Sequence, residues 1–185
     1  MKRGAIVGAF LIACTASIPR HTAAQQRPSL SVEATFGYVY GYTAGEYLSD
    51  RQGIGVDLML GVRPGAAGKR GIVFGANASL YDGGPRTLIC YPATTRDGCI
   101  QPFPFFRVAG ALVGWENAST TLRVMGGPAW AHAESDALAW QARLDGALPV
   151  VWRLALVGSV RGTVVPSYRG DAVRLLGLGL GVRVR

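Results

Sequence analysis

Residues 176–185 read LGLGLGVRVR, and they decide the fold because large apolar residues alternate without a break with small or charged ones. Alternation with a period of two is typical of a β-strand that has one apolar face and one small or polar face. Leu176, Leu178 and Leu180 share the apolar face, and Arg183 lies on the opposite face. This segment therefore predicts a strand rather than a helix.

The same pattern recurs in seven further segments of the chain. We predict strands at residues 30–43, 54–63, 71–80, 105–115, 120–127, 138–148 and 154–164. The segment at 105–115 is the least regular, because both of its faces carry apolar residues and Arg107 marks only one side. No helical spacing of apolar residues follows the N-terminal segment. The chain is therefore predicted to be an all-β domain of eight antiparallel strands.

The face opposite the apolar one determines the class of protein. It consists mainly of Gly, Ala, Ser and Thr with isolated charges, whereas a water-facing surface would be rich in Lys and Glu. A narrow barrel lumen takes small residues and a few paired charges, and lipid takes Leu, Val, Ile and aromatics. We therefore predict that the apolar face meets lipid and that the lumen charges are Glu33, Asp57, Arg107, Arg123, Arg143, Asp145, Arg161 and Arg183.

Composition supports a folded domain with unusual hydrophobicity. The 185 residues are 49% hydrophobic and 16% charged, which argues against a disordered chain or a coiled coil. The formal net charge of +8 comes from 19 basic and 11 acidic side chains. The arginines are spaced singly over several strands without a basic and aromatic cluster, so no nucleic-acid partner is expected.

The N-terminus predicts an export signal over residues 1–24, followed by a barrel domain over residues 25–185. Lys2 and Arg3 precede a short apolar stretch, and small residues before Gln25 offer a cleavage site. Leu11 to Cys14 also resembles the lipobox of bacterial lipoproteins, so a lipid tether at Cys14 is an alternative. Cleavage at the predicted site removes three basic residues and leaves 16 against 11, a charge of +5.

The connections between the predicted strands alternate in length in the first half of the chain, long, short, long, short. Outer-membrane barrels have long loops outside the cell, short periplasmic turns and girdles of aromatic residues. Phe105, Phe106, Trp130 and Trp140 fall at the long-loop ends of their strands, as an outer girdle requires. Pro128 lacks the N–H that a sheet needs, so we expect a β-bulge there.

The signal segment, the eight alternating strands and the unequal connections together resemble the small outer-membrane β-barrels of the OmpA/OmpX type. The resemblance implies an eight-stranded antiparallel up-and-down transmembrane β-barrel in the bacterial outer membrane. It also implies outer-membrane lipid and the barrel assembly machinery as partners. One departure is the C-terminal aromatic residue that this machinery reads in the family, because the sequence here ends Val182-Arg183-Val184-Arg185.

Two cysteines of the mature chain lie in the longest predicted loop, residues 82–102. An even pair in an exported protein is most simply a disulfide, so we predict a Cys90–Cys99 bridge. A metal site would need more ligands than these and His132, so no metal or other cofactor is predicted. A cross-linked loop is suited to binding an extracellular ligand, although protection from proteases explains it equally well.

One segment could carry catalysis. Residues 132–136, HAESD, bring a base, carboxylates and a hydroxyl together, and some eight-stranded outer-membrane barrels are lipid-modifying hydrolases. Adjacent residues in a loop point in different directions, however, and position 134 is Glu where the lipid A deacylases have a histidine-x-serine spacing. A solvated polar loop is the simpler interpretation, and no catalytic residue is assigned.

Three classes of function follow from these features. The first is a non-enzymatic outer-membrane barrel with a charge-filled lumen, which supports the envelope or presents loops for adhesion and recognition. The second is an outer-membrane lipid A-modifying hydrolase. The third is a soluble periplasmic or lipid-tethered barrel that binds an apolar ligand. We favour the first, because an eight-stranded barrel has an interior just wide enough to be filled by side chains.

Overall fold

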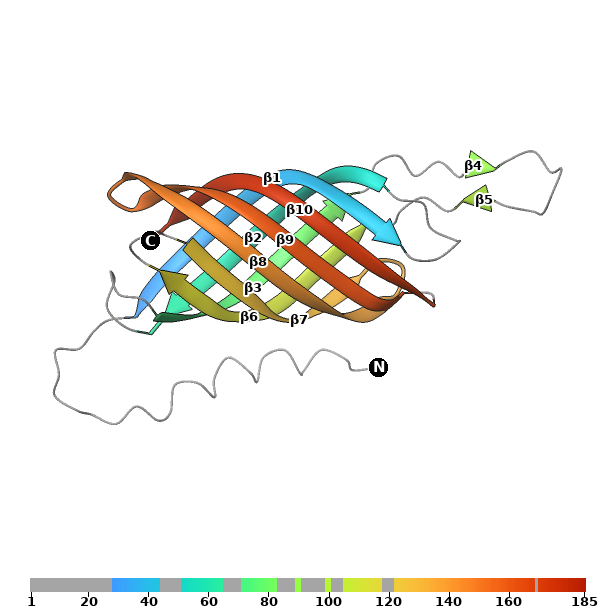
Figure 1. Ribbon diagram of the computed structural model, residues 1–185, viewed down its shortest axis with the longest axis horizontal. Helices are drawn as coiled ribbons and strands as arrows, with labels where there is room; N and C mark the ends of the chain where they lie inside the picture. Colours follow the sequence, from blue (N-terminus) through green and yellow to red (C-terminus); the bar gives the residue numbers. More distant parts are fainter. Residues whose placement is uncertain are drawn as a thin grey trace, which may run out of the picture.

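The computed structural model describes residues 28–43, 51–64, 71–82, 89–90, 99–100, 105–117, 122–168 and 170–185. The predicted signal segment, the lipobox at Cys14 and most of the loop at 82–102 lie outside these residues. The described chain forms one closed antiparallel barrel with the strand order β1-β10-β9-β8-β7-β6-β3-β2 (Figure 1). The eight-stranded up-and-down barrel predicted from the alternation is therefore confirmed.

All eight predicted segments are strands, and several extend beyond their predicted ends. Their bounds are β1 (Ser29–Thr43), β2 (Arg51–Arg63), β3 (Gly71–Asp82), β6 (Phe106–Asn117), β7 (Leu122–His132), β8 (Asp136–Val151), β9 (Leu154–Tyr168) and β10 (Asp171–Val184). Strand β9, for example, continues through Pro166, whose ring faces outward. Strand pairing in a barrel continues past the apolar band, so the end of the apolar pattern does not end the strand.

The barrel closes where the first strand pairs with the last. Glu33 faces Arg183 and Phe36 faces Leu180 in the register of β1 and β10. Closure gives every long strand two neighbours, so none of them presents a free edge of unpaired backbone groups. In a bilayer this is essential, because no water in the hydrocarbon core can satisfy an open edge.

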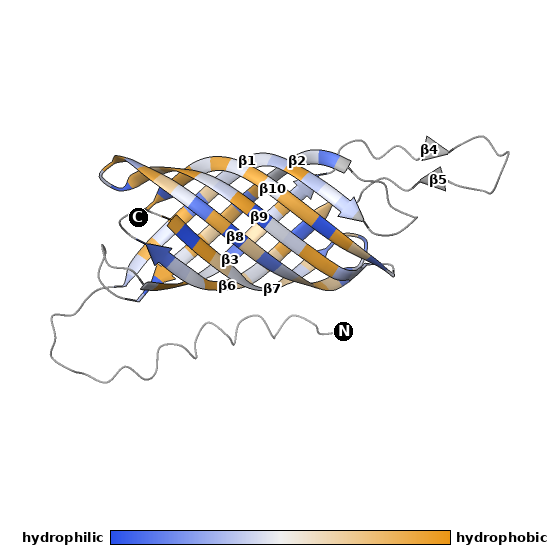
Figure 2. Ribbon diagram, in the orientation of Figure 1, coloured by the Kyte–Doolittle hydropathy of each residue, from blue (hydrophilic) through white to orange (hydrophobic). Residues whose placement is uncertain are grey.

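The apolar face of every long strand lies on the outside of the barrel. Phe36 is 57% exposed and Leu178 is 51% exposed, although both lie in the middle of their strands. Orange bands of hydrophobic residues run around the wall in Figure 2. The inward positions carry small and polar residues, the ion-pairing charges and clusters of buried apolar side chains. The inside-out arrangement predicted from the sequence is thus present in the fold.

The two ends of the barrel differ. One end, called here the turn end, holds the start of β1, the end of β10 and the two-residue turn at 152–153. The opposite end, the loop end, holds the connection between β3 and β6, which contains two short strands, β4 (Ile89–Cys90) and β5 (Cys99–Ile100). At the loop end β9 and β10 join through Gly170, whose φ of 92° favours glycine.

Pro128 does not create a β-bulge, so that prediction is wrong. The pairing of β7 with β8 runs through Pro128 and Trp140 without a shift, and the register with β6 is the same before and after Pro128. The ladder with β6 instead omits the pairs of residues 111–112 with 127–128. The missing N–H is therefore accommodated by an interrupted ladder rather than by an inserted residue.

The described part of the chain contains no helix long and apolar enough to cross a membrane.

The outward position of Leu178 can be tested by replacing it with arginine. Leu178 lies in the middle of β10, where an arginine facing hydrocarbon costs about 2–4 kcal/mol, whereas Val184 ends the strand, where the cost falls to about 0–1 kcal/mol. We expect Leu178→Arg to destabilise the barrel more than the control Val184→Arg, measured by reversible unfolding in phospholipid vesicles. Equal losses would contradict a lipid-facing wall.

Candidate functional site

The interior of the barrel holds most of the charges that the sequence singles out. The structure buries seven of them, with at most 4% exposure each: Glu33, Asp57, Arg123, Arg143, Asp145, Arg161 and Arg183. Arg63 and Glu116 are buried beside them. In the described part of the chain the interior therefore contains five arginines and four carboxylates. Such charges are tolerated away from water only when they are paired.

Glu33 is the centre of the network. Its Oε2 accepts a hydrogen bond of 2.8 Å from Nε of Arg183 and lies 3.8 Å from Nη1 of Arg123. Its Oε1 forms an ion pair with Nη2 of Arg143. These three arginines come from β10, β7 and β8, so one carboxylate on β1 ties together strands on several sides of the barrel.

Arg143 connects this centre to two further carboxylates. Its Nε donates a hydrogen bond of 2.6 Å to Oδ1 of Asp145, and its Nη1 pairs with Oδ2 of Asp57. Asp57 also lies 3.2 Å from Nη1 of Arg161 and accepts a hydrogen bond from the Ser79 hydroxyl. The network thus runs across the lumen from β2 to β8 and β9.

A second group of charges lies closer to the turn end. Oε2 of Glu116 is 3.6 Å from Nη2 of Arg123 and 3.8 Å from Nη1 of Arg63. Its Oε1 is 3.7 Å from Nη1 of Arg183 and pairs with Arg185. A cavity of about 370 Å³ opens beside this group. The close packing of the guanidinium groups depends on small neighbours, because a Cβ on Gly61 would lie 2.7 Å from the Ser31 hydroxyl and 3.4 Å from Arg123.

Arg107 lies on the outer face of β6, so its prediction as a lumen charge is corrected. The sequence of β6 is apolar on both faces, and the charge at Arg107 misled the assignment of inside and outside. The inward positions are the even-numbered ones, from Phe106 to Glu116. Glu116 falls on the inward face by this parity, and Trp115 faces outward. Because a tryptophan suits the outer girdle, the alternation places its neighbour Glu116 inside, and this signal could have identified Glu116 as a lumen charge.

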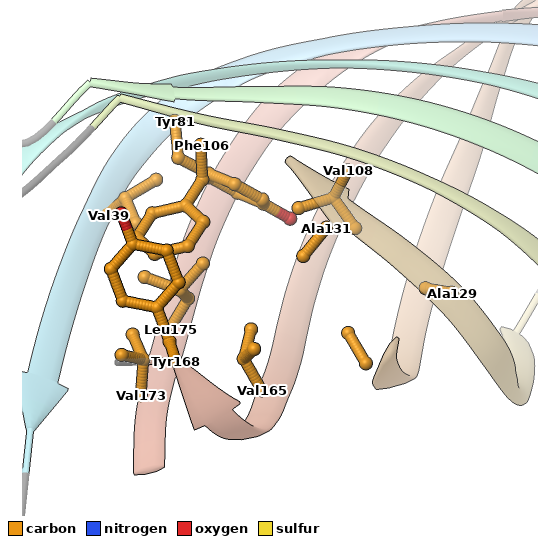
Figure 3. Close-up of a cluster of buried hydrophobic side chains, with 11 residues drawn as sticks. Val39, Tyr81, Phe106, Val108, Ala129, Ala131, Val165, Tyr168, Val173 and Leu175 are labelled. Carbon is orange, nitrogen blue, oxygen red and sulfur yellow. The ribbon is translucent and has the colours of Figure 1, made fainter. Parts of the chain in front are cut away.

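The half of the interior near the loop end is apolar rather than charged. Tyr81, Tyr168 and Phe106 are its largest members, and the rings of Phe106 and Tyr168 meet edge to face with centroids 5.2 Å apart and planes at 62°. Figure 3 shows these rings close together inside the wall. The loop-end cluster comprises Val39, Tyr81, Phe106, Val108, Ala129, Ala131, Ala139, Val165, Tyr168, Val173 and Leu175. Phe106 therefore belongs to this plug and not to the predicted outer girdle, whereas Trp130 and Trp140 are exposed as predicted.

The cysteines of the long loop are partners in the backbone register. Strands β4 and β5 pair Cys90 with Cys99 directly. Opposite residues in an antiparallel pair have Cα atoms about 4.5–5.5 Å apart, within the range that a disulfide spans. The bridge itself remains a prediction, because the side chains of both cysteines lie outside the described structure.

The segment at 132–136 does not assemble a catalytic triad. Nδ1 of His132 is 2.6 Å from Oδ1 of Asp136, which lowers the pKa of this exposed carboxyl group. In the described part of the chain the Ser135 hydroxyl makes no hydrogen bond to His132, and both residues are exposed. A base with its orienting carboxylate is present without a nucleophile positioned beside it.

The described residues contain no group of three or more His, Cys, Asp or Glu side chains that could hold a metal ion. The interior side chains are suited to stabilising the closed barrel and to blocking its lumen. One half contains the ion pairs and a small apolar cluster of Met59, Val73, Leu112 and Met125, and the other half contains the loop-end cluster.

Comparison with known proteins agrees with this geometry at the level of fold. No family model and no curated protein matches the chain. Among solved structures, Neisserial surface protein A matches with a TM-score of 0.59 and 16% identity, covering 85% of this chain and 98% of that one. The chain has the fold of a small outer-membrane barrel.

Two structures of Ail, the attachment invasion locus protein of Yersinia pestis, also match, one of them in complex with the heparin analogue sucrose octasulfate. Each has a TM-score of 0.45 and 14% identity, and they cover 83% of this chain and 98% or 97% of Ail. At these identities the likeness concerns the barrel and not the residues that bind a partner.

The network around Glu33 can be tested by removing its charge. Glu33→Gln leaves several buried guanidinium groups without their shared carboxylate, and breaking a buried ion pair costs about 3–5 kcal/mol. We expect a loss of this size in the free energy of unfolding, measured in detergent by denaturant titration. The control Asp136→Asn, at an exposed pair, should change stability very little. Equal losses for the two variants would contradict a charge-paired interior.

Proposed function

We propose that this protein is a non-enzymatic outer-membrane barrel that serves as a rigid platform for its long loop. The observation that carries the proposal is the filled interior, in which an ion-pair network occupies one half and the loop-end cluster occupies the other. A barrel closed in this way offers no open path for solutes. We infer that the long connection between β3 and β6 is then the part of the protein that acts in recognition.

Transport through the lumen is disfavoured on steric grounds. Phe106, Tyr168 and Val165 are each at most 2% exposed, and they close the interior near the loop end. A solute would have to displace both this cluster and several ion pairs. The energetic cost of leaving buried charges without partners makes such displacement unfavourable.

The two alternative functions receive less support. A lipid hydrolase needs a nucleophile next to its base, and Ser135 is not bonded to His132 in the described chain. A carrier of an apolar ligand needs an apolar cavity, whereas the apolar half of this interior is occupied by its own side chains. The exposed Leu, Val and Trp residues of the outer wall would also be unfavourable in water.

The proposal also states how the chain reaches the outer membrane and which end of the barrel faces the outside of the cell. The export signal at residues 1–24 delivers the chain across the inner membrane, and the barrel assembly machinery inserts it. The turn end then faces the periplasm, and the loop end faces the outside, as in barrels of this kind. The loop at 82–102 is the candidate binding site for an extracellular ligand.

Cell fractionation tests the proposed location directly. The protein should sediment with the outer membrane, leave it only with detergent, and migrate faster on a gel when unheated than after boiling. A soluble periplasmic protein, or one released by washing without detergent, would contradict the proposal. Replacing residues 83–104 with a short turn should leave this heat-dependent migration intact while abolishing binding of an extracellular ligand.

The disulfide and its side of the membrane can be tested together with a membrane-impermeant thiol reagent. Intact cells should be labelled only after reduction if Cys90 and Cys99 are bridged outside the cell. The variant Cys90→Ser leaves Cys99 unpaired, so it should be labelled without reductant. Labelling of the wild type without reductant would contradict the bridge, and no labelling in any state would place the loop on the periplasmic side.

A planar bilayer experiment tests the sealed interior. The purified barrel should produce no stable single-channel steps, because the ion-pair network and the loop-end cluster block the lumen. A larger porin in the same bilayer provides the positive control. Stable steps from the wild-type protein would show that a conducting path exists.

A further inference from the structure

The outer wall carries an open notch at the place where three strands have small residues. It is lined on the outside by Ala76, Ala109, Ala111, Pro128, Trp130 and Leu138 and has a volume of about 390 Å³. Much of the rest of the wall is formed by exposed Leu, Val, Phe and Trp side chains, with further small residues at Ala142, Gly146 and Gly158. The interrupted ladder beside Pro128 lies at the same place, between β6 and β7. The notch is therefore a local depression in the apolar surface.

A cation lies directly beyond this notch on the same strand. Arg107 is exposed and shares the outer face of β6 with Ala109 and Ala111. Outward residues on a strand are about 7 Å apart, so the Cα of Arg107 lies one step from Ala109 at the edge of the notch. The Arg107 side chain lies over the Phe105 ring, 5.8 Å from its centroid, and forms no ion pair in the described part of the chain.

A second polar group extends the cationic end of the notch. His132 pairs with Arg107 in the register of β6 and β7, and Asp136 pairs with His132 in the register of β7 and β8. The hydrogen bond between His132 Nδ1 and Asp136 holds the imidazole ring, and Nε2 can donate to an anion when the ring is protonated. His132 therefore lies between Arg107 and the carboxylate of Asp136.

We propose that this face binds one anionic lipid of the surrounding membrane, with its phosphate at Arg107 and His132 and an acyl chain in the notch. The proposal rests on the membrane location proposed above. The ligand is a lipid because a lipid carries a negatively charged headgroup next to an apolar chain. The wall offers the complementary order, with a cationic residue next to an apolar notch. Arginine is also well suited to phosphate, which its planar group can bind through two hydrogen bonds.

The opposite side of the barrel provides an internal control. Arg174 is exposed near the loop end of β10 and lies over the Tyr42 ring, 5.9 Å from its centroid, in the same way as Arg107 over Phe105. The next outward residues of β10 are Leu176 and Leu178, both 51% exposed. They fill the space that alanines leave open below Arg107. Both places therefore have an exposed arginine next to an aromatic ring. The notch lies beside Arg107 and not beside Arg174.

The experiment measures lipid retention by native mass spectrometry after reconstitution in nanodiscs that contain phosphatidylglycerol and phosphatidylcholine. We expect the wild type to retain one phosphatidylglycerol molecule in preference to phosphatidylcholine. Arg107→Gln should lower the affinity roughly tenfold or more, because a charge-assisted hydrogen bond is lost. Ala111→Leu, which fills the notch from an exposed position, should lower it as well. The control Arg174→Gln should retain lipid like the wild type.

Several outcomes would overturn the proposal. Equal retention by Arg107→Gln and the wild type would show that the arginine does not hold the headgroup. Equal losses for Arg107→Gln and Arg174→Gln would show only a general attraction to surface charge. A dimer that Ala111→Leu disrupts, without retained lipid, would assign the notch to a second copy of the chain. Heat-dependent migration shows whether each variant is folded, and a wild type that fails to enter nanodiscs would contradict the proposed function itself.

Discussion

The closed barrel depends on the pairing of buried arginines with a smaller number of carboxylates. Glu33 lies at the seam between β1 and β10, opposite Arg183 in the register, and it also contacts Arg123 and Arg143. Each of these charges would be costly if buried alone, so the network is favourable only when all the strands are in place. The seam and the interior therefore stabilise one another, and the correct register is the one that pairs the charges.

The division of the interior into two halves follows from the environment of each end. Near the turn end, Glu116, Arg63 and Arg185 lie beside a cavity, where solvent can reach part of the network. Near the loop end the interior is closed by aromatic and branched apolar side chains. The charged half favours one register of the strands, because a shifted register would leave buried charges without partners of opposite sign. An apolar half excludes water, and together the two halves give a rigid cylinder whose outward features are its wall and its loops.

Some residues could be assigned from the sequence and others could not. Leu178, Phe36 and Arg183 lie in strands with a clean alternation, and their sides of the wall follow from it. Strand β6 is apolar on both faces, so Arg107 was assigned to the interior and Glu116 was not assigned. The role of Phe106 was missed for the same reason, because aromatic residues suit both an outer girdle and an apolar plug. The prediction of a bulge at Pro128 was wrong, because an interrupted ladder is enough to accommodate a missing N–H.

The sequence alone determined the eight strands, the order of their neighbours along the chain and, outside β6, the face of each strand that lies on the outside of the barrel. These features depend on local alternation, which a strand of period two makes visible in the order of residues. Only the tertiary structure decided which charges pair and where the apolar plug lies. It also showed that the alanines of β3 and β6 meet Pro128 below Arg107. Such contacts join residues far apart in the chain, and they depend on the shear of the closed barrel, which no single segment specifies.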